Sequence, residues 1–292
     1  MRKARGCFIF FMIIIVIAAV IIFYFIGSND RKIASDNSVK INYSEELASY
    51  KDNGIDYLFL GIDERENENK FEGRTDTMII MHIGNNGKNA LISIPRDTRV
   101  ELEGHGINKI NAAYVYGGVN MVVDEIYELT DIKIDKVMLA NFSAFIKLVD
   151  ALGGVTITVA EPLHDDKSGS DFDPGTHNFT GEQALAFSRC RATAKGDFDR
   201  MDRQKYLLAE LFRQKANFSI IPQIPDILKI LNEDTKSNFK TFDYIKVAFK
   251  MMINRDDFIL LTLPGESATI DNVSYVIVDP DEAKIFLNEN LG

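Results

Sequence analysis

The most constraining feature of the sequence is an uncharged apolar run near its amino terminus. Residues 7–26 read CFIFFMIIIVIAAVIIFYFI, twenty residues without a charge. At about 1.5 Å of rise per residue such a helix is about 30 Å long, the thickness of the hydrocarbon core of a membrane. Arg2, Lys3 and Arg5 precede the run, and a basic cluster in this place favours a cytoplasmic amino terminus. We therefore expect one transmembrane helix over residues 7–26.

The alternative interpretation of this run is a cleaved signal peptide. The run is longer than the apolar segment of a typical signal peptide, and no small-x-small cleavage site follows at residues 27–29. We therefore predict an uncleaved, single-pass signal anchor in the cell membrane. Residues 1–6 are then a cytoplasmic tail, residues 27–53 an extracellular stalk, and residues 54–292 an extracellular domain.

The charge of the chain excludes one class of partner. The chain has 33 basic and 43 acidic residues, and a net charge of −10. Residues 33–292 hold 28 of the basic and 42 of the acidic residues, so the predicted outer part carries −14. Sequence-independent binding of nucleic acid depends on basic charge. The six residues before the anchor are also too few to fold into a DNA-reading element, so we expect no nucleic acid as a partner.

Short β-rich runs alternate with amphipathic helical patterns from residue 54 onward. Strands are expected at 57–62, 77–83, 89–94, 136–140, 155–159, 258–263 and 273–278. Helices are expected at 107–118, 120–130, 142–152, 180–187, 197–216, 222–232, 241–252 and 280–290. Residues 161–179 are expected to form a long polar loop. The alternation predicts an α/β fold, a single layered domain with a mixed central β-sheet between helices.

Arginine and aspartate residues occur at the ends of these strands and in the turns that follow. Asp63 ends a strand in GID, Arg74 and Asp76 lie in GRTDT, and Arg96 follows LISIP. A guanidinium group matches phosphate oxygens with two parallel hydrogen bonds. Two carboxylates suit a hard divalent cation whose other ligands are phosphate oxygens. Together these residue types indicate a metal-dependent pyrophosphate site, with surface ion pairing as the alternative for each residue alone.

Two later segments carry further arginines. Arg189 and Arg191 of FSRCR are two residues apart, so in extended backbone both point to one face and Cys190 points to the other. We expect Cys190 to fill space rather than to act as a nucleophile. In DFDRMDRQ, Arg200 and Gln204 share one face of a helix. These two segments therefore add cationic and amide groups to the predicted site.

Seven motifs occur in the order of the LytR-CpsA-Psr family, which the chain resembles over about residues 54–216. They are GID (61–63), GRTDTMII (73–80), SIPRDTRV (93–100), KINAAYVYGG (109–118), LVDALGGV (148–155), SRCR (188–191) and DFDRMDRQ (197–204). No single motif is decisive, but seven in order are specific. The predicted anchor also fits the family.

The resemblance implies a membrane-anchored phosphotransferase of the cell envelope. Such an enzyme moves a glycopolymer (teichoic acid, capsule or another wall polysaccharide) from a polyprenyl-pyrophosphate carrier onto peptidoglycan and forms a phosphodiester link. The family fold is a mixed sheet between helices, which agrees with the pattern above. Two other functions stay open for the same residues: hydrolysis of the lipid pyrophosphate, and non-catalytic binding of the glycan lipid by an envelope regulator.

The resemblance also implies roles for individual residues. It implies Mg²⁺, or Mn²⁺, held by Asp63 and Asp76. It implies a pyrophosphate clamp of Arg74, Arg96, Lys109, Arg189, Arg191, Arg200 and Gln204. The residues that it places closest to the chemistry are Arg74, Asp76, Arg96, Arg189 and Arg191. Asp97 and Arg203 also lie in family motifs, with less defined contacts.

Overall fold

A computed structural model describes the chain from residue 39 onward, with short gaps. The described residues are 39–42, 54–62, 71–194, 196–215, 217–254 and 258–292. Within these ranges, no helix is both long and apolar enough to cross a membrane. The predicted anchor over residues 7–26 lies outside them, as does the predicted metal ligand Asp63.

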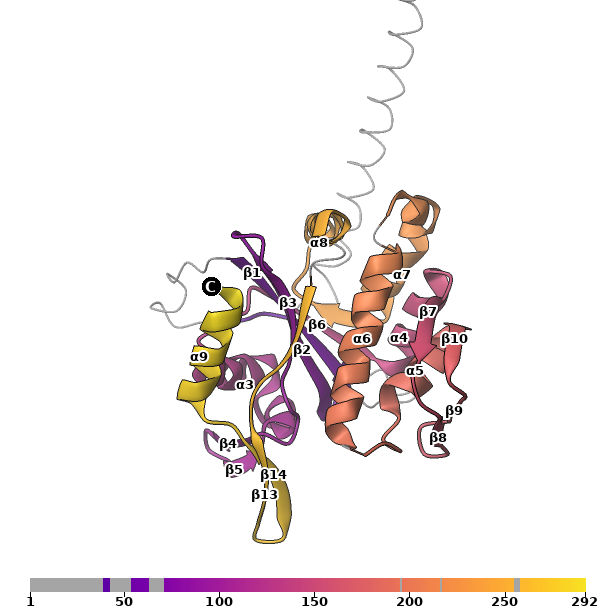
Figure 1. Ribbon diagram of the computed structural model, residues 1–292. Coiled ribbons are helices and arrows are strands. Elements are labelled where there is room, and N and C mark those ends of the chain that lie inside the picture. Colours follow the sequence, from indigo (N-terminus) through magenta and orange to yellow (C-terminus); the bar gives the residue numbers. More distant parts are fainter. Residues whose placement is uncertain (1–38, 43–53, 63–70, 195, 216, 255–257) are drawn as a thin grey trace, which may run out of the picture.

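A mixed six-stranded sheet runs through the centre of the described domain (Figure 1). Its strands are β1 (Gly54–Ile62), β2 (Thr75–Gly84), β3 (Asn89–Ser93), β6 (Lys136–Asn141), β11 (Thr235–Ser237) and β12 (Phe258–Thr262). Their spatial order is β11-β6-β1-β2-β3-β12. β1 and β6 are parallel, as are β3 and β12, and the other neighbouring pairs are antiparallel. The predicted mixed central sheet is confirmed.

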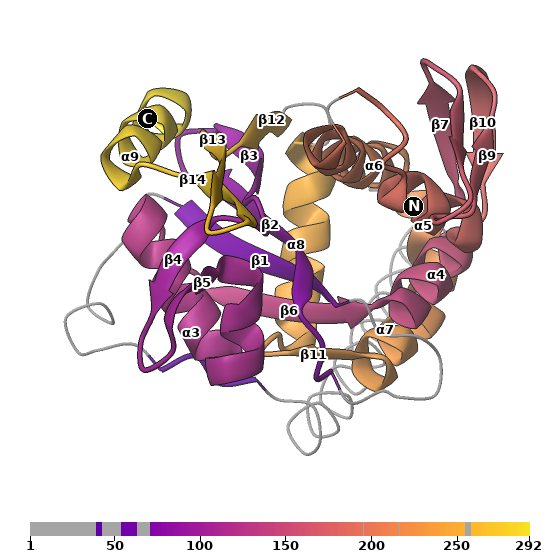
Figure 2. The same cartoon turned by 90° about the horizontal axis from the view of Figure 1, so that it is seen from below.

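Helices cover both faces of this sheet. In chain order the helical elements are η1 (Ile110–Ala112), α3 (Ala113–Thr130), α4 (Phe142–Ala151), α5 (Gly181–Arg189), α6 (Asp197–Lys215), η2 (Phe218–Gln223), α7 (Ile224–Glu233), α8 (Thr241–Asn254) and α9 (Pro280–Leu291). α3 and α9 lie on one side of the sheet, and α6 and α8 lie on the other (Figures 1 and 2). The layered α/β architecture predicted from the sequence is therefore confirmed.

The alternation of side chains along β1 explains why the sheet needs helices on both faces. Leu58, Leu60 and Ile62 point into the core shared with α3 and α9. Tyr57 points into the opposite core, where it lies with Phe239. Because successive strand residues face opposite sides, a strand that is apolar at nearly every position has to be buried on both.

Four two-stranded sheets surround this centre. They pair β4 (Arg99–Leu102) with β5 (Gly106–Lys109), β7 (Val155–Val159) with β10 (Gly175–Phe179), β8 (Leu163–Asp165) with β9 (Ser170–Phe172), and β13 (Glu266–Ile270) with β14 (Val273–Ile277). The strands β7 to β10 join α4 and α5 in a flanking block on the right of Figure 2. Phe179, Phe187 and Cys190 are buried in the core of this block, so the predicted packing position of Cys190 is confirmed.

Two predicted segments differ from the structure. The predicted loop over 161–179 is wrong, because it holds three short strands, and one of them pairs with β7 from Phe179↔Val155 onward. The predicted helix over 107–118 is wrong in its first part, where β5 pairs with β4. Both errors have one cause: these strands are short and largely exposed, so tertiary pairing rather than an apolar period defines them.

Several local sequence features determine where helices begin, bend or end. Thr180 caps α5, and its side chain and that of Gln183 bond each other's backbone N–H groups. α3 is kinked at Gly118, where the sequence predicts a break between two helices. After α4 the chain turns at Gly154, whose φ of 74° and close approach to the Phe179 carbonyl leave no room for a Cβ.

The last described part of the predicted stalk lies on the domain. Val39 and Ile41 pack against the core beneath α3. The Val39 N–H donates to the Ser237 carbonyl at 3.2 Å, and the Asn42 N–H donates to Asn120 Oδ1 at 3.0 Å. Residues 39–42 are thus part of the folded domain.

Candidate active site

Two neighbouring strands bring the first group of polar residues together. Asp76 lies at the start of β2, and Arg96 and Asp97 follow the end of β3. Since β2 and β3 are antiparallel neighbours, the start of one lies beside the end of the other. The turn after β3 is closed by the Thr98 N–H and hydroxyl, which both donate to the Pro95 carbonyl. The Asp76 and Arg96 side chains therefore meet at one end of the sheet.

Asp76 is bound from two sides within this group. Arg96 Nη1 donates to Asp76 Oδ2 at 2.8 Å. Asn111, in η1, donates from Nδ2 to Asp76 Oδ1 at 3.2 Å. These contacts fix the Asp76 carboxylate at the cavity wall, and each of its oxygens keeps acceptor capacity for a further partner.

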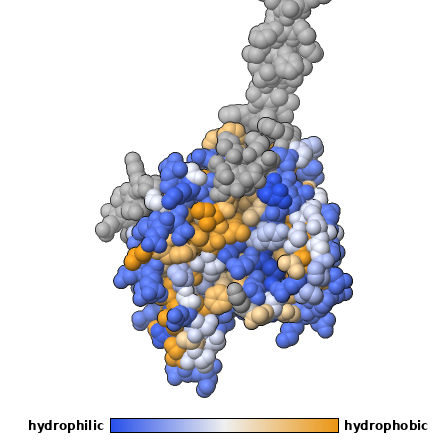
Figure 3. Space-filling model, in the orientation of Figure 1, coloured by the Kyte–Doolittle hydropathy of each residue, from blue (hydrophilic) through white to orange (hydrophobic). Residues whose placement is uncertain are grey.

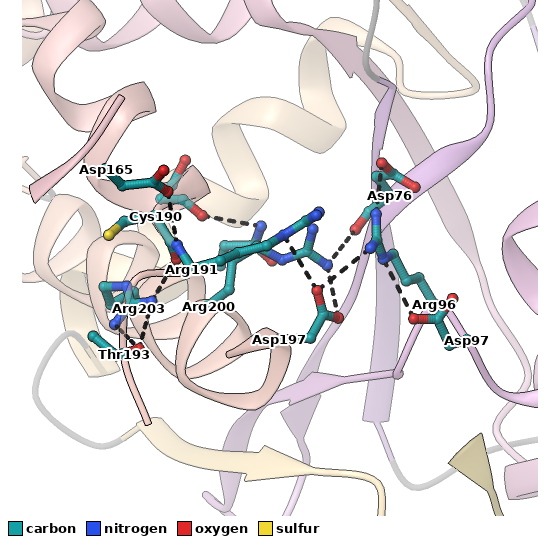
Figure 4. A network of polar contacts seen from close by, with 12 residues as sticks. Asp76, Arg96, Asp97, Asp165, Cys190, Arg191, Thr193, Asp197, Arg200 and Arg203 are labelled. Carbon is teal, nitrogen blue, oxygen red and sulfur yellow. Dashed lines mark hydrogen bonds and ion pairs between the residues drawn. The ribbon is translucent and has the colours of Figure 1, made fainter. Parts of the chain in front are cut away.

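The amino-terminal turn of α6 brings a second group to the same place. α6 packs against the β3 side of the sheet and begins at Asp197. Arg200 Nη2 lies 3.4 Å from the Asp76 carbonyl oxygen, so this helix turn contacts the start of β2 directly. Arg191 approaches from the loop between α5 and α6 (Figure 4).

Asp197 joins the two groups, and it is not among the residues predicted from the sequence. Its carboxylate lies 3.0 Å from Arg200 Nη2, 3.5 Å from Arg96 Nη2 and 3.5 Å from Arg191 Nε. Figure 4 shows the three guanidinium groups converging on this one carboxylate. The available signal was its place three residues before Arg200 within DFDRMDRQ, since residues three apart face each other on a helix.

A third carboxylate, Asp97, also lines the cavity that Asp76 faces. Lys109 Nζ lies 2.8 Å from Asp97 Oδ1, and Arg96 Nε lies 3.7 Å from Asp97 Oδ2. Lys109 is the last residue of β5, so the β4–β5 hairpin carries it to the site. Asp97 and Lys109, both parts of family motifs, are therefore in direct contact.

These residues surround a cavity of about 350 Å³. It is lined by Arg74, Asp76, Arg96, Asp97, Lys109 and Asn111. With Arg191, Arg200 and Asp197 beside it, the site holds five cationic groups against three carboxylates. The site therefore has a surplus of positive charge on a chain whose net charge is −10.

The most buried of these cations is Arg200. Its side chain is 4% exposed. Burial, assisted by the charges of Arg96 and Arg191 and opposed by the carboxylate of Asp197, lowers the pKa of Arg200 to about 10. Among the described residues, the buried Nε–H groups of Arg96 and Arg200 have no hydrogen-bond acceptor. Buried donors of this kind favour binding of an anion that accepts from them.

Two predicted clamp residues, Gln204 and Arg191, and the family-motif residue Arg203 hold the segment between α5 and α6. Gln204 Nε2 donates to the Ser188 carbonyl at 3.3 Å, and Arg203 donates to the Cys190 carbonyl. The Arg191 N–H donates to Asp165, which holds the pKa of the Asp165 carboxyl below its ordinary value. These bonds fix the loop that positions the Arg191 side chain.

The prediction that Arg189 and Arg191 share a face of extended backbone is wrong. Arg189 is the last residue of α5, and its guanidinium carbon lies 4.6 Å from the ring centre of Phe142. The helix predicted over 180–187 extends two residues further, so Arg189 has helical backbone. Arg191 lies beyond the helix, and its side chain contacts Asp197. The structure thus brings Arg74, Asp76, Arg96, Lys109, Arg191 and Arg200 together and places Arg189 on an aromatic ring.

A preformed metal cluster is not found in the described part of the chain. No group of three or more His, Cys, Asp or Glu side chains is arranged there to hold a metal ion. Asp76 faces the cavity, and Asp63 lies outside the described residues. The predicted Mg²⁺ site therefore stays a prediction.

Comparison with known proteins identifies the family of the chain. A sequence model of the LytR_cpsA_psr family matches residues 22–290. The chain belongs to this family. The LytR-CpsA-Psr match extends beyond the seven motifs to nearly the whole domain, so the carboxyl-terminal third is part of the family fold.

Individual LytR-CpsA-Psr relatives agree with this assignment. The polyisoprenyl-teichoic acid–peptidoglycan teichoic acid transferase TagU of Halalkalibacterium halodurans is 34% identical over 229 residues, 77% of this chain and 74% of the relative. The crystal structure of protein gbs0355 from Streptococcus agalactiae has a TM-score of 0.71 at 26% identity, covering 84% of this chain and 89% of that one. The structure of TagT bound to LIIa-WTA has a TM-score of 0.66 at 26% identity, covering 89% and 98%.

Proposed function

We propose that this chain is a phosphotransferase that moves a glycopolymer from a polyprenyl-pyrophosphate carrier onto a peptidoglycan hydroxyl. The observation that carries the proposal is the convergence of Arg96, Arg191 and Arg200 on Asp197, beside a cavity that Arg96 lines, in a site with surplus positive charge. The teichoic acid transferase function of the TagU relatives and the LIIa-WTA bound to TagT support the same substrate class.

The pyrophosphate of the carrier binds among the guanidinium groups. Its oxygens accept hydrogen bonds from the Nε–H groups of Arg96 and Arg200, which have no hydrogen-bond acceptor among the described residues, and Arg74 and Lys109 approach from the cavity wall. These cations stabilise the charge that develops on the leaving polyprenyl phosphate, and in phosphoryl transfer such positioning and electrostatic stabilisation supply most of the catalysis.

The reaction exchanges one phosphorus–oxygen bond for another. An acceptor sugar hydroxyl attacks the phosphorus linked to the glycan, and its proton passes to a carboxylate of the site. The bond between that phosphorus and the polyprenyl phosphate oxygen breaks, and the electron pair leaves with the polyprenyl phosphate. The product is a phosphodiester between glycopolymer and peptidoglycan.

A divalent cation fits one wall of this site. Asp76 would hold it, with Asp63 as the second predicted ligand, because the Asp76 carboxylate faces the cavity and keeps acceptor capacity beside Arg96 and Asn111. When bound, Mg²⁺ or Mn²⁺ neutralises charge on the pyrophosphate oxygens.

The predicted anchor over residues 7–26 suits a lipid-linked substrate. It would hold the domain outside the cell membrane on the surface where the polyprenyl carrier resides. Enzyme and donor then share one surface, and the lipid tail stays in the bilayer.

The test uses the full chain in detergent with a labelled polyprenyl-pyrophosphate glycan and a peptidoglycan acceptor. Wild type should form labelled phosphodiester product only when acceptor is present, which distinguishes transfer from hydrolysis. An Arg96→Ala, Arg200→Ala double variant should lose this product, whereas Arg213→Ala, an exposed position at the far end of α6, should keep it. Full transfer by the double variant would refute the proposal.

A further inference from the structure

The β4–β5 hairpin leads from the cavity to an exposed aromatic surface. Lys109 lines the cavity at the base of the hairpin. Ile107 lies two residues earlier on β5, so it shares a face with Lys109, and its side chain is 43% exposed. His105, two residues earlier again, is exposed in the hairpin turn.

His105 is stacked on Tyr116 at the far end of the hairpin. The two ring centres are 4.2 Å apart, and the ring planes differ by 15°. Tyr116 belongs to the first turn of α3, five residues after the cavity-lining Asn111, and is 46% exposed. A stacked, exposed pair of rings is a rigid flat surface that the core of the domain does not use.

Tyr275 lies at the near end, beside the cavity. Its ring centre is 5.9 Å from Lys109 Nζ and 5.9 Å from Arg99 Cζ. The β13–β14 hairpin that carries Tyr275 is fixed to the site, because the Val276 N–H donates to the Asp97 carbonyl at 2.9 Å. β4, β5, β13, β14 and the start of α3 lie at the same end of the molecule (Figures 1 and 2).

We propose that Tyr275, Ile107, His105 and Tyr116 form a saccharide-binding strip for the acceptor glycan. This inference rests on the proposed function, which requires a sugar hydroxyl at the cavity. The C–H face of a pyranose ring packs against the negative face of an aromatic ring, and its hydroxyl groups remain free for polar partners. The strip carries aromatic rings at both ends, the stacked His105–Tyr116 pair at one and the Tyr275 ring beside Lys109 and Arg99 at the other.

The position of Asp97 favours the acceptor over the glycan of the donor as occupant. Asp97 and its partner Lys109 lie where the strip enters the cavity, whereas the buried Arg200 lies on the α6 side. A hydroxyl from the strip therefore reaches the phosphorus past Asp97. As the new oxygen–phosphorus bond forms, Asp97 takes the hydroxyl proton, and the polyprenyl phosphate leaves with the electrons of the broken bond.

The experiment measures donor and acceptor dependence of transfer separately, with full-length protein and soluble peptidoglycan glycan strands. Tyr116→Ala and Tyr275→Ala should each raise the acceptor KM about tenfold, in line with the energy of one aromatic contact. Tyr116→Ala should leave the donor KM unchanged. Tyr116→Phe should behave as wild type, since it keeps the ring. Phe249→Ala on α8, where the side chain is 56% exposed, is the matched control.

A binding experiment distinguishes failure of the saccharide-binding strip from failure of the proposed function. Titration of glycan strands into donor-free protein should show about tenfold weaker binding by Tyr116→Ala at an unchanged thermal midpoint. An unchanged acceptor KM and affinity in both alanine variants overturns the strip. A rise in the donor KM of Tyr116→Ala instead assigns this ring to the donor glycan and overturns the acceptor assignment. If wild type binds strands through Tyr116 but makes no acceptor-dependent product, the proposed function fails and the saccharide site stands.

Discussion

At the scale of single residues, the site depends on Arg96 for its geometry. One guanidinium group contacts Asp76, Asp97 and Asp197 through three different nitrogen atoms. Lysine keeps the charge but has no planar fork that reaches three carboxylates. This arrangement makes the position sensitive to a change that conserves charge.

We predict that Arg96→Lys lowers kcat/KM for transfer by about 10- to 100-fold, the loss expected for one or more charge-assisted hydrogen bonds. Steady-state kinetics with varied donor measures it. Arg213→Lys is the matched control, because the half-exposed Arg213 side chain pairs with Glu210 one turn away on the surface of α6. Wild-type kinetics of Arg96→Lys would show that charge alone suffices.

Asp197 is the residue whose loss should disturb the most partners. Asp197→Ala removes the carboxylate that holds Arg96, Arg191 and Arg200 together. We predict a fall in kcat of about tenfold or more, because mutual repulsion then spreads the three cations. Asp226→Ala, an exposed acidic residue in the first turn of α7, should leave kcat unchanged. A variant of Asp197 with normal kcat would mean that the arginines are held by other contacts.

The residues of the site were predictable to different degrees. Asp76, Arg96 and Arg200 belong to family motifs, and the structure brings them together. Asn111 and Asp197 lie in the same motifs but were not assigned, because their importance depends on which side chains the fold brings to them. Arg189 was misplaced because a backbone conformation was assumed where α5 continues.

At the scale of elements, α3 contains a carboxyl group whose ionisation opposes folding. Burial, with smaller contributions from the neighbouring carboxylates of Glu128 and Asp124, raises the pKa of Glu125 to about 7. The folded state therefore holds this proton more tightly than the unfolded state, whose glutamate has a pKa near 4.3. The contribution of this group to the free energy of unfolding is therefore present at low pH and is lost as pH rises toward 7.

We predict that Glu125→Gln raises the free energy of unfolding by about 1–2 kcal/mol at pH 8, after discounting for partial exposure, and by less at pH 5. Urea unfolding at both pH values measures the difference. Glu289→Gln, an exposed glutamate on α9, should change stability equally little at both. An equal effect of Glu125→Gln at pH 5 and pH 8 would contradict the raised pKa.

The elements that the sequence predicts well are those with two buried faces or strong end signals. β1 and β2 are apolar at most positions because both of their faces are covered. The strands between 163 and 179 and the three-residue β11 have no such pattern, since the pairing of β8 with β9, of β10 with β7 and of β11 with β6 creates them. A strand that forms only because it pairs with another strand has no apolar period of its own, so the periodicity of its segment does not predict it.

At the scale of the whole molecule, an acidic body carries one cationic cavity. The net charge of −10 disfavours nonspecific contact with polyanions, whereas the cavity holds five cations against three carboxylates. A small, highly charged phosphate ligand should therefore bind at one place and stabilise the fold.

We predict that pyrophosphate at about ten times its Kd stabilises the protein by about 1.4 kcal/mol, a rise in Tm of about 3–6 °C for a domain of this size. The rise should shrink in high salt, which screens partly exposed charges. Differential scanning fluorimetry with NaCl at matched ionic strength measures it. An equal rise in the Arg96→Ala, Arg200→Ala double variant would place pyrophosphate elsewhere.

The edge strand β12 has a consequence for how the chain folds. Phe258 pairs with Asn89, 169 residues earlier, and Ile259 and Leu260 on this edge are exposed. Figure 3 shows an apolar patch at the middle of this face of the molecule. Until β12 is added, β3 is an open edge of an apolar sheet, and such edges pair with other chains. Folding therefore waits for a distant part of the chain. A chain truncated before residue 258 should aggregate although all the arginines of the site are present.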